Sequence, residues 1–376
     1  MQPDLTRPRR IPTILGTLAI VVLSVLASLA LAELAVRVAA PQPASWLGIY
    51  REHPDLPFFA LQPNLTASVS TGETHWTAIV DGDGDRVGKS PVASGRCSAI
   101  WLGDSFTFGH GVEYEESFVG LVQAATPATR QVNTAVPGYG PVQYRQVLEH
   151  RLARGDRFDW VVTALYAGND FHDCIWEKDV PVRDGVLGDS GDLRSRVKRS
   201  SHLYRLLSIA YHRAVPDRDD RIGAVGDELA DPNAWRGEFL VTARARLGAE
   251  LATIARGAKG AGARAAFVII PTVESLAARA RAGASGERDP HLPVAVLRDT
   301  LAELGASYLD LSDALAGARG DATFFPIDGH LTPEGNRIAA RAILERWSFA
   351  CEAQASSRAR EESLPNRVDV LEGRGF

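Results

Sequence analysis

AIWLGDSFTFG, residues 99–109, is a short apolar run that ends at Gly103 and is followed at once by Asp104 and Ser105. Four later segments are further strand candidates, at 131–136, 160–166, 265–270 and 307–311. Continuously apolar strands separated by helices are typical of a parallel sheet covered by helices on both faces. The sequence therefore predicts an α/β fold, a three-layer sandwich with a doubly wound parallel sheet.

The segments between these runs have helical patterns. They lie at 117–125, 142–153, 239–255 and 294–304. A last helix is expected to begin near Pro333, with Thr332 as its N-cap, because proline fits the first helical position and threonine the cap.

Polar residues follow the predicted strands at the edge where an open parallel sheet binds ligands. Ser105 follows the first strand, Gly138 the second and Asn169 the third. Asp328 and His330 come after the fifth, directly before the last helix. A serine hydroxyl becomes a nucleophile when a neutral histidine takes its proton and a carboxylate orients that histidine. Glycine N–H groups and an asparagine amide can hold an oxyanion. The pattern predicts acyl-transfer chemistry.

These strand ends resemble the four sequence blocks of the SGNH (GDSL-type) hydrolase family. The blocks are residues 103–109, 133–138, 168–170 and 328–330, within a similar region of roughly 97–349. The resemblance implies an SGNH hydrolase, flavodoxin-like sandwich. It makes Ser105 the nucleophile, His330 the base and Asp328 the acid. It also implies an oxyanion hole formed by the N–H groups of Ser105 and Gly138 and the side chain of Asn169.

Two positions depart from the family pattern. Asp328 lies two residues before His330, whereas the family usually places its acid three before, where this chain has Ile327. The shorter spacing is similar to that of membrane-anchored bacterial members that modify polysaccharides with O-acetyl groups, so Asp328 stays the predicted acid. The third block has Ala167 where a glycine is usual.

Each candidate also has a purely structural interpretation. Ser105 could cap the helix that follows it, His330 could be a surface histidine, and Gly138 and Asn169 could be turn residues. Asp104 and Asp170 are interpreted as structural, bonding to loop backbone. The spacing of His172, Asp173 and Cys174 fits no common metal site.

The N-terminal segment predicts a membrane anchor. Residues 11–32 carry no charge and are long enough to span a hydrocarbon core as a helix. Arg7, Arg9 and Arg10 precede them, so the positive-inside rule places residues 1–10 in the cytoplasm and the rest outside the inner membrane. The alternative is a signal peptide cleaved after Ala30-Leu31-Ala32, which would give a secreted protein.

The remaining segments complete the predicted organisation. Residues 33–95, rich in proline, are interpreted as a stalk and N-terminal preamble, and 96–350 as the hydrolase-like domain. Residues 171–236 are expected to be an insertion over the sheet edge or a lid, with a disordered loop as the alternative, and 351–376 a polar tail. In the insertion, the aromatic side chains of Trp176, Tyr204 and Trp235 are candidates for stacking on sugars or for core packing.

Composition limits the function classes. A net charge of −5 argues against nucleic-acid binding. Three cysteines without a C-x-x-C pair argue against a disulfide framework and against structural zinc. The topology places Cys97 and Cys351 at the same end of the sheet, so we hypothesise a disulfide between them.

The sequence therefore predicts an exported serine esterase that hydrolyses acyl esters, with acetyl as the expected group and carbohydrate as a candidate substrate. It would work through an acyl-serine and without a metal or an organic cofactor. Two alternatives stay open. The first is an O-acyltransferase that uses a sugar hydroxyl of an exported polysaccharide as acceptor. The second is a non-catalytic glycan-binding scaffold.

Overall fold

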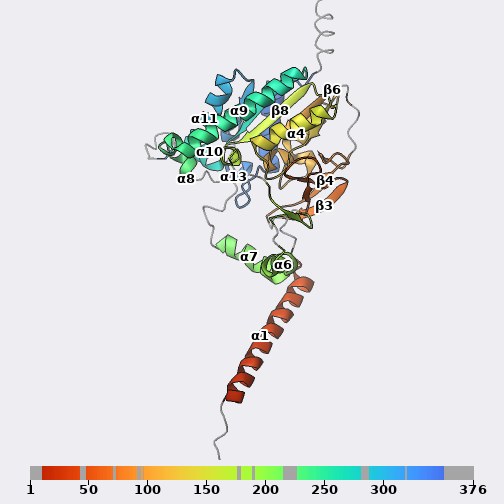
Figure 1. Cartoon of the computed structure of the whole chain (residues 1–376), viewed down its shortest axis with the longest axis vertical. Helices are drawn as coiled ribbons and strands as arrows, with labels where there is room; N and C mark the ends of the chain where they lie inside the picture. The colour runs from red at the N-terminus through yellow and green to blue at the C-terminus, as the bar shows by residue number, and fades with distance from the viewer. Residues whose placement is uncertain are drawn as a thin grey trace, which may run out of the picture.

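The computed structural model describes residues 11–42, 48–70, 73–90, 95, 97–175, 179–188, 191–214, 227–280, 288–317 and 320–350. The predicted cytoplasmic N-terminus and the predicted polar tail lie outside these residues. An α/β body stands at one end of the long helix α1 (Ile11–Ala39) (Figure 1). The helices α6 (Leu193–Ser200) and α7 (His202–Ala214) lie between the two.

The body is built on an eight-stranded sheet. In spatial order its strands are β12 (Tyr308–Asp310), β11 (Arg264–Ile270), β8 (Trp160–Tyr166), β6 (Cys97–Leu102), β7 (Thr129–Asn133), β5 (Arg86–Val87), β4 (His75–Val80) and β3 (Leu65–Ser70). The five strands from β12 to β7 are mutually parallel. Numbered along the chain, they have the flavodoxin-like order 2-1-3-4-5, whose switch point lies between β6 and β8.

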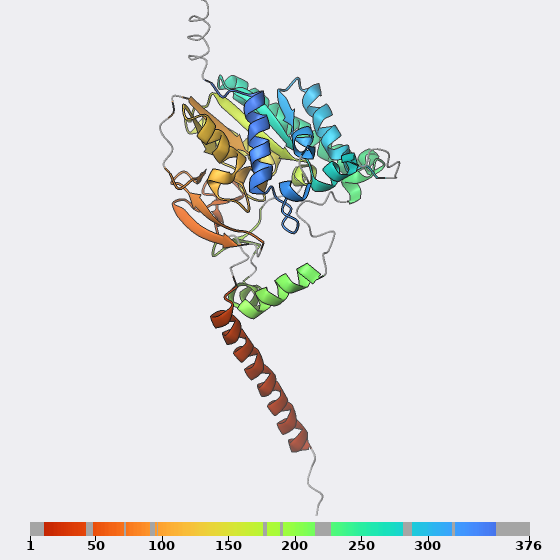
Figure 2. The same ribbon diagram turned by 180° about the vertical axis from the view of Figure 1, so that it is seen from behind.

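Helices cover both faces of the sheet, which confirms the predicted three-layer sandwich. One face is covered by α3 (Phe118–Ala125) and α14 (Pro333–Arg346), and the other by α4 (Pro141–Ala153), α9 (Glu238–Gly260) and α11 (Leu292–Glu303) (Figures 1 and 2). The side chains of β6 alternate between these layers. Trp101 packs on the α3 side and Ile100 on the α4 side, and both are fully buried.

The predicted strands and helices are present with small shifts at their ends. β8 has its predicted bounds, and β6 begins at Cys97 rather than at residue 99. β7 ends at Asn133 instead of 136, because the Asn133 side chain bonds the backbone of Thr107 and Ala135 and turns the chain out of the sheet. The hydroxyl of Thr332 accepts from the N–H of Gly335 at 3.1 Å, so Thr332 caps α14 as predicted.

The sheet is mixed rather than wholly parallel, which corrects the prediction. β3, β4 and β5 pair antiparallel at one edge, and they come from the segment interpreted as a stalk and preamble. In β4 the buried residues Trp76, Ala78 and Val80 alternate with more exposed ones, a period of two that is typical of an antiparallel strand with one covered face. The prolines nearby exclude long helices but not strands.

The N-terminal helix is longer than the uncharged segment that predicted it. α1 continues past residue 32 to Ala39, where Glu33 and Arg37 form an ion pair one turn apart, at 2.6 Å. Its part Gly16–Ala39 contains a window of 18 residues with a mean hydropathy of 2.5 and no buried residue, so by length and composition it can cross a membrane or serve as a signal sequence.

The described residues of the segment 171–236 do not form one cover over the sheet edge. The hairpin of β9 (Val182–Arg183) and β10 (Val186–Leu187) packs near β1 (Tyr50–Glu52), which pairs with β2 (Phe59–Leu61). α6 and α7 lie instead at the end of α1, which corrects the predicted lid for these helices (Figure 2). Trp176 lies outside the described residues.

Short helices complete the body. They are α2 (Ser105–Phe108), α5 (Asp170–Asp173), α8 (Asp227–Ala230), α10 (Val273–Ala280), α12 (Ser312–Ala316) and α13 (Gly320–Thr323). The ring of Trp235 packs against Phe171 at 4.8 Å, and its Nε1 donates to the carbonyl of Leu229. The contacts of Trp235 therefore agree with its core-packing interpretation.

Cys97 is disulfide-bonded, whereas Cys174 is free and buried. Cys97 pairs in register with Thr129, whose hydroxyl donates to the carbonyl of Phe349 at 2.6 Å. The chain after α14 thus returns to the start of β6. Cys351, the partner we predict for Cys97, lies outside the described residues.

Arg86 of β5 joins the edge strands to the loop after Ser105. Its side chain is fully buried, and its guanidinium donates to the carbonyls of Phe108, Gly109 and Val112 at 2.5–2.7 Å. It also lies over the ring of Trp76, 4.8 Å from its centroid. A residue outside the predicted hydrolase-like domain therefore holds the 108–112 loop.

Arg86→Leu is expected to lower the free energy of unfolding by about 3 kcal/mol, because three buried carbonyls lose their donor. Denaturant unfolding followed by tryptophan fluorescence measures the change. Arg341→Leu is the control, since Arg341 is exposed on α14 and its loss is expected to cost less than about 0.5 kcal/mol. Equal losses in the two variants would contradict this role of Arg86.

Candidate active site

Ser105 is the first residue of α2, directly beyond the carboxyl end of β6. Asp104, not Ser105, caps this helix, because its carboxylate accepts from the N–H of Phe106 at 2.9 Å. The Ser105 hydroxyl is therefore not used as the cap. The local sequence explains the position: Leu102 ends the strand, and Gly103 and Asp104 make the turn into the helix.

His330 reaches Ser105 from the loop before α14. Its Nε2 lies 2.7 Å from the Ser105 hydroxyl oxygen, and its Nδ1 bonds an oxygen of Asp328. His330 is only 2% exposed, which rules out the surface-histidine interpretation. The structure thus brings together the predicted serine, histidine and acid in one line of hydrogen bonds.

His110 extends this line beyond the predicted residues. Its Nε2 lies 3.3 Å from the second carboxylate oxygen of Asp328. Its ring packs on that of His330 at 4.5 Å and on Trp76 at 5.3 Å. The sequence analysis missed His110 because its partner is 218 positions away and because histidine alone in a loop has no recognisable spacing.

The surroundings set the protonation of the acid and of the base. Burial alone would raise the pKa of Asp328, but the hydrogen bonds from His110 and His330 outweigh it and hold the pKa well below its usual range. Burial lowers the pKa of His330, and the nearby His110 lowers it further, against the opposing effect of Asp328. The imidazole is therefore neutral at pH 7, as a general base must be.

The loop of Asp328 is held by Glu73 from another segment and by a backbone hydrogen bond of its own. A carboxylate oxygen of Glu73, between β3 and β4, accepts from the N–H of Asp328 at 2.7 Å and from that of Ile327 at 3.2 Å. The N–H of Phe325 donates to the carbonyl of His330 at 2.8 Å. The side chain of Ile327 is 49% exposed, so the residue at the family's usual acid position points away from the buried pair.

Gly138 lies on the loop after β7, the strand next to β6. Its φ of +93° is in the left-handed region that favours glycine, and a Cβ there would come within 3.3 Å of the Phe59 ring. The N–H of Val136 donates to the carbonyl of Gly103 at 3.3 Å, which joins this loop to that of Ser105. Among the described residues, neither the N–H of Ser105 nor that of Gly138 has a hydrogen-bond acceptor.

Asn169 lies on the opposite side of β6, directly after β8, and neighbours a group of buried acids. Its side chain lies beside Asp104. Burial raises the pKa of Asp104 to about 7, and the charge of Asp173 adds to the rise, whereas the Phe106 N–H and Asn169 oppose it. Burial likewise raises the pKa of Asp170 well above its usual range.

Hydrogen bonds give these acids a structural role in the loops around Ser105, as the sequence predicted for Asp104 and Asp170. Asp170 accepts from the hydroxyl of Tyr144 at 3.0 Å and from the N–H of Tyr166 at 3.0 Å. The carboxyl groups therefore fix the ends of β6 and β8, between which Asn169 and Ser105 lie.

His110, Asp328 and His330 are also close enough to share a metal ion, because their ligand atoms lie within 4.8 Å of one another. The same atoms are already joined by the hydrogen bonds between the two rings and the carboxylate. The remaining nitrogen of His330 faces Ser105. The arrangement therefore fits proton transfer between serine and histidine.

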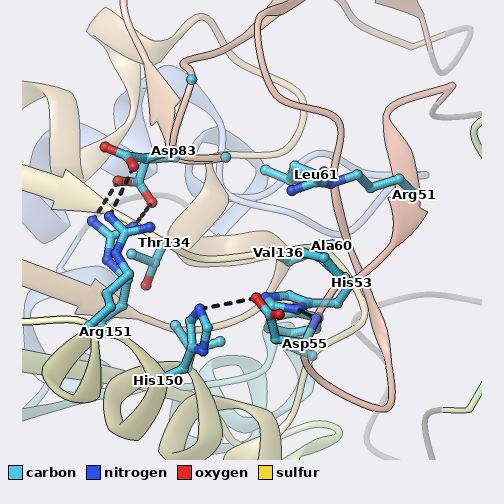
Figure 3. Close-up of a pocket in the computed structure, with 17 residues that line it drawn as sticks. Arg51, His53, Asp55, Ala60, Leu61, Asp83, Thr134, Val136, His150 and Arg151 are labelled. Carbon is cyan, nitrogen blue, oxygen red and sulfur yellow. Dashed lines mark hydrogen bonds and ion pairs between the residues drawn. The ribbon is translucent and has the colours of Figure 1, made fainter.

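A separate cavity of about 160 Å³ lies next to the Gly138 loop (Figure 3). Thr134 lines one side of it and His150 of α4 another. Arg151 donates to both oxygens of Asp85 at 2.9 and 3.0 Å, and Asp85 belongs to the turn between β4 and β5. These ion pairs hold the turn against α4, so we assign the cavity no part in the chemistry at Ser105.

Comparisons with known proteins place the chain in a family. The model of the GDSL-like lipase/acylhydrolase family matches residues 101–338, more than half of the chain. Among solved structures, a member of the lipolytic protein G-D-S-L family from Veillonella parvula is 14% identical, with a TM-score of 0.40, over 67% of this chain and 98% of that one. A catalytic mutant of Axe2, an acetylxylan esterase from Geobacillus stearothermophilus, is 13% identical, with a TM-score of 0.36, over 70% and 98%. The comparison with curated proteins found no match.

His110→Phe is expected to lower kcat roughly tenfold, because the ring stack remains but Asp328 loses one of its two donors. His110→Gln keeps an N–H donor and is expected to keep most of kcat.

In the unmodified protein the acid limb of kcat/KM is expected below pH 6.5, since His330 must be neutral and its pKa is lowered. Both variants remove the electrostatic effect by which His110 lowers the pKa of His330, so that pKa rises and the acid limb moves to higher pH. Profiles with a chromogenic ester measure both effects, and unchanged limbs would contradict the role of His110.

Asp104 is expected to make the protein less stable as the pH rises from about 4 through about 7. Its folded pKa of about 7 lies above the unfolded value, so its favourable contribution is fully present below the unfolded pKa and lost as the pH passes the folded one. Thermal unfolding between pH 5 and 8 measures the effect, and Asp104→Asn is expected to flatten it. Asp299 is exposed on α11, so Asp299→Asn should keep the same loss of thermal stability with rising pH as the unmodified protein. An equal dependence of stability on pH in all three proteins would contradict the raised pKa of Asp104.

Proposed function

This chain belongs to the GDSL-like lipase/acylhydrolase family, and we propose that it is a membrane-anchored serine esterase with its catalytic domain outside the cytoplasm. The observation that carries the proposal is the 2.7 Å contact between the Ser105 hydroxyl and Nε2 of His330, with Asp328 on the other nitrogen. This is the arrangement that makes a serine hydroxyl nucleophilic.

The proposed reaction begins with the attack of Ser105 on the carbonyl carbon of an ester. His330 takes the serine proton, and Asp328 stabilises the imidazolium that forms. The backbone N–H groups of Ser105 and Gly138 and the amide of Asn169 are the proposed donors to the oxyanion. His330 then gives its proton to the leaving alcohol, and an acyl-serine remains. Water, activated by the same histidine, releases the acid and restores Ser105.

We propose acetyl as the acyl group and a carbohydrate as the alcohol. Phe106 and His110 pack on the His330 ring at 4.7 and 4.5 Å, so large rings crowd the reacting atoms, which supports a small acyl group. The two-residue spacing from Asp328 to His330 is similar to that of polysaccharide-modifying members, which supports a sugar ester. A sugar hydroxyl in place of water would make the protein an O-acyltransferase through the same acyl-serine.

We propose that α1 is an uncleaved single-pass anchor in the inner membrane. Its apolar part is longer than the roughly 7–15 residues of a signal-peptide core. The helix also runs without a break through the Ala30-Leu31-Ala32 segment to Ala39, and its last turns bond to the segment before α7. Both features support retention of α1 in the mature protein.

The full chain in detergent micelles is expected to hydrolyse aryl acetates faster than aryl butyrates or octanoates. Ser105→Ala should lower the rate by about a thousandfold or more, because the nucleophile is lost. Ser275→Ala is the matched control: Ser275 also bonds a histidine, His291, at 2.8 Å but lies on α10 and should keep full activity.

The same assay with an acetylated donor and an oligosaccharide acceptor separates hydrolase from transferase. Free acetate identifies hydrolysis, and a mass gain on the acceptor identifies transfer. If Ser105→Ala loses no activity relative to the unmodified chain while glycan binding persists, the acyl-serine mechanism is excluded for both reactions and the non-catalytic glycan-binding scaffold is favoured.

A further inference from the structure

α6 and α7 lie apart from the sheet and its covering helices, at the end of α1 that faces the body (Figures 1 and 2). α7 packs on α1, and α6 packs on α7. Helices of this length need a partner for their apolar face to be stable in water. Within the described residues, α1 contacts these helices only through its last turns, so most of the surface of α6 and α7 has no protein packed on it.

Hydrogen bonds fix the junction of α6 and α7 to α1. The carboxylate of Glu33 accepts from the N–H groups of His202 and Leu203 at 2.9 and 2.8 Å, and from the hydroxyl of Ser201 at 2.8 Å. Glu33 thus caps α7 from another helix. Arg37 donates to the carbonyl of Ser200 at 2.5 Å. The two helices are therefore held next to the end of α1 that follows its uncharged residues.

Exposed apolar residues lie along one face of each of these helices, and together we call them the apolar stripe. It consists of Leu193, Val197, Tyr204, Leu207 and Tyr211, which are 77%, 41%, 37%, 60% and 61% exposed. The spacings of four within α6, and of three and four within α7, put the members on one face of each helix. Exposed apolar area of this kind is stabilised when it leaves water.

The same segment has basic residues but no acidic ones. Residues 193–214 contain five arginines and one lysine but no aspartate or glutamate, in a chain whose net charge is −5. A basic amphipathic helix with exposed leucine and tyrosine is typical of a segment that lies in a membrane interface. Tyrosine favours that layer because its ring is apolar and its hydroxyl is polar.

We propose that α6 and α7 lie in the head-group layer of the membrane that α1 spans and bind its anionic phospholipids. The apolar stripe would rest on the acyl chains, and the excess positive charge of the segment would attract the anionic head groups. The inference rests on the proposed anchoring of α1. It adds a second membrane contact that sets the height and the tilt of the body. α13, close to the His330 loop in the chain, lies on the side of the body toward α7 (Figure 1), so the contact also holds the catalytic edge toward the lipid surface.

The test uses the full chain in vesicles of phosphatidylcholine and phosphatidylglycerol, with a spin label at one introduced cysteine. Leu207→Cys reports on the stripe, and Tyr211→Cys is a second site on the same face. Leu23→Cys reports on the apolar part of α1. Val241→Cys is the matched control, because Val241 is an exposed apolar residue, 52% exposed, on α9 of the body. Cys97 is disulfide-bonded and Cys174 is buried, so labelling without reductant, with the unmutated chain as blank, isolates each new site.

Collisions with oxygen, which concentrates in lipid, are compared with collisions with a water-soluble nickel complex. The oxygen-to-nickel ratio is expected to be severalfold higher at residues 207, 211 and 23 than at 241. Removing the anionic lipid should lower the ratio at 207 and 211 but not at 23.

The other outcomes overturn the inference in different ways. A lipid signal at 23 with a water signal at 207 and 211 leaves the anchor standing and refutes the interfacial contact. Exclusion of both reagents from 207 and 211 means that protein covers the stripe, as a lid or a second copy would. A water signal at 23 as well refutes the proposed anchor itself.

Discussion

One line of hydrogen bonds, from Ser105 through His330 and Asp328 to His110, sets the demands on the rest of the molecule. Such bonds weaken steeply once distance and angle depart from their narrow optimum. Four side chains from two distant segments must therefore be held within a fraction of an ångström. Helix caps, turn acids and the buried Arg86 do this, because each fixes the backbone from which one of the four side chains extends.

The surroundings shift the pKa values of the carboxyl groups near Ser105 in opposite directions. Asp328 receives two imidazole donors and stays ionised, whereas Asp104, buried beside other acids, holds its proton until near neutral pH. Pairs of acids whose surroundings separate their pKa values are a recurring property of catalytic sites. Here the ionised Asp328 orients the base, and the protonated Asp104 supports the turn into α2, so the same residue type has two different roles in two loops of one site.

Most of the parallel sheet and its helices could be predicted, because buried strands and capped helices leave strong local patterns in sequence. β8 and the cap at Thr332 are examples. The antiparallel edge could not be predicted, because β5 has only two residues and β4 ends in three consecutive apolar residues, 78–80, which interrupt the alternation of polar and apolar side chains. His110 and Glu73 were missed for another reason. Their importance lies in which distant atoms they meet, and no local pattern encodes that.

The dependence on Arg86 has a practical consequence for the boundaries of the catalytic unit. The family match begins at residue 101, inside β6, yet the arginine that secures the 108–112 loop and the glutamate that secures the Asp328 loop both lie before it. A shortened chain that starts at the match would keep the nucleophile and the base but lose two of their supports and leave the edge of β7 bare. The smallest soluble unit should therefore begin near residue 48, so that what resembles a tether in the sequence is retained as part of the enzyme.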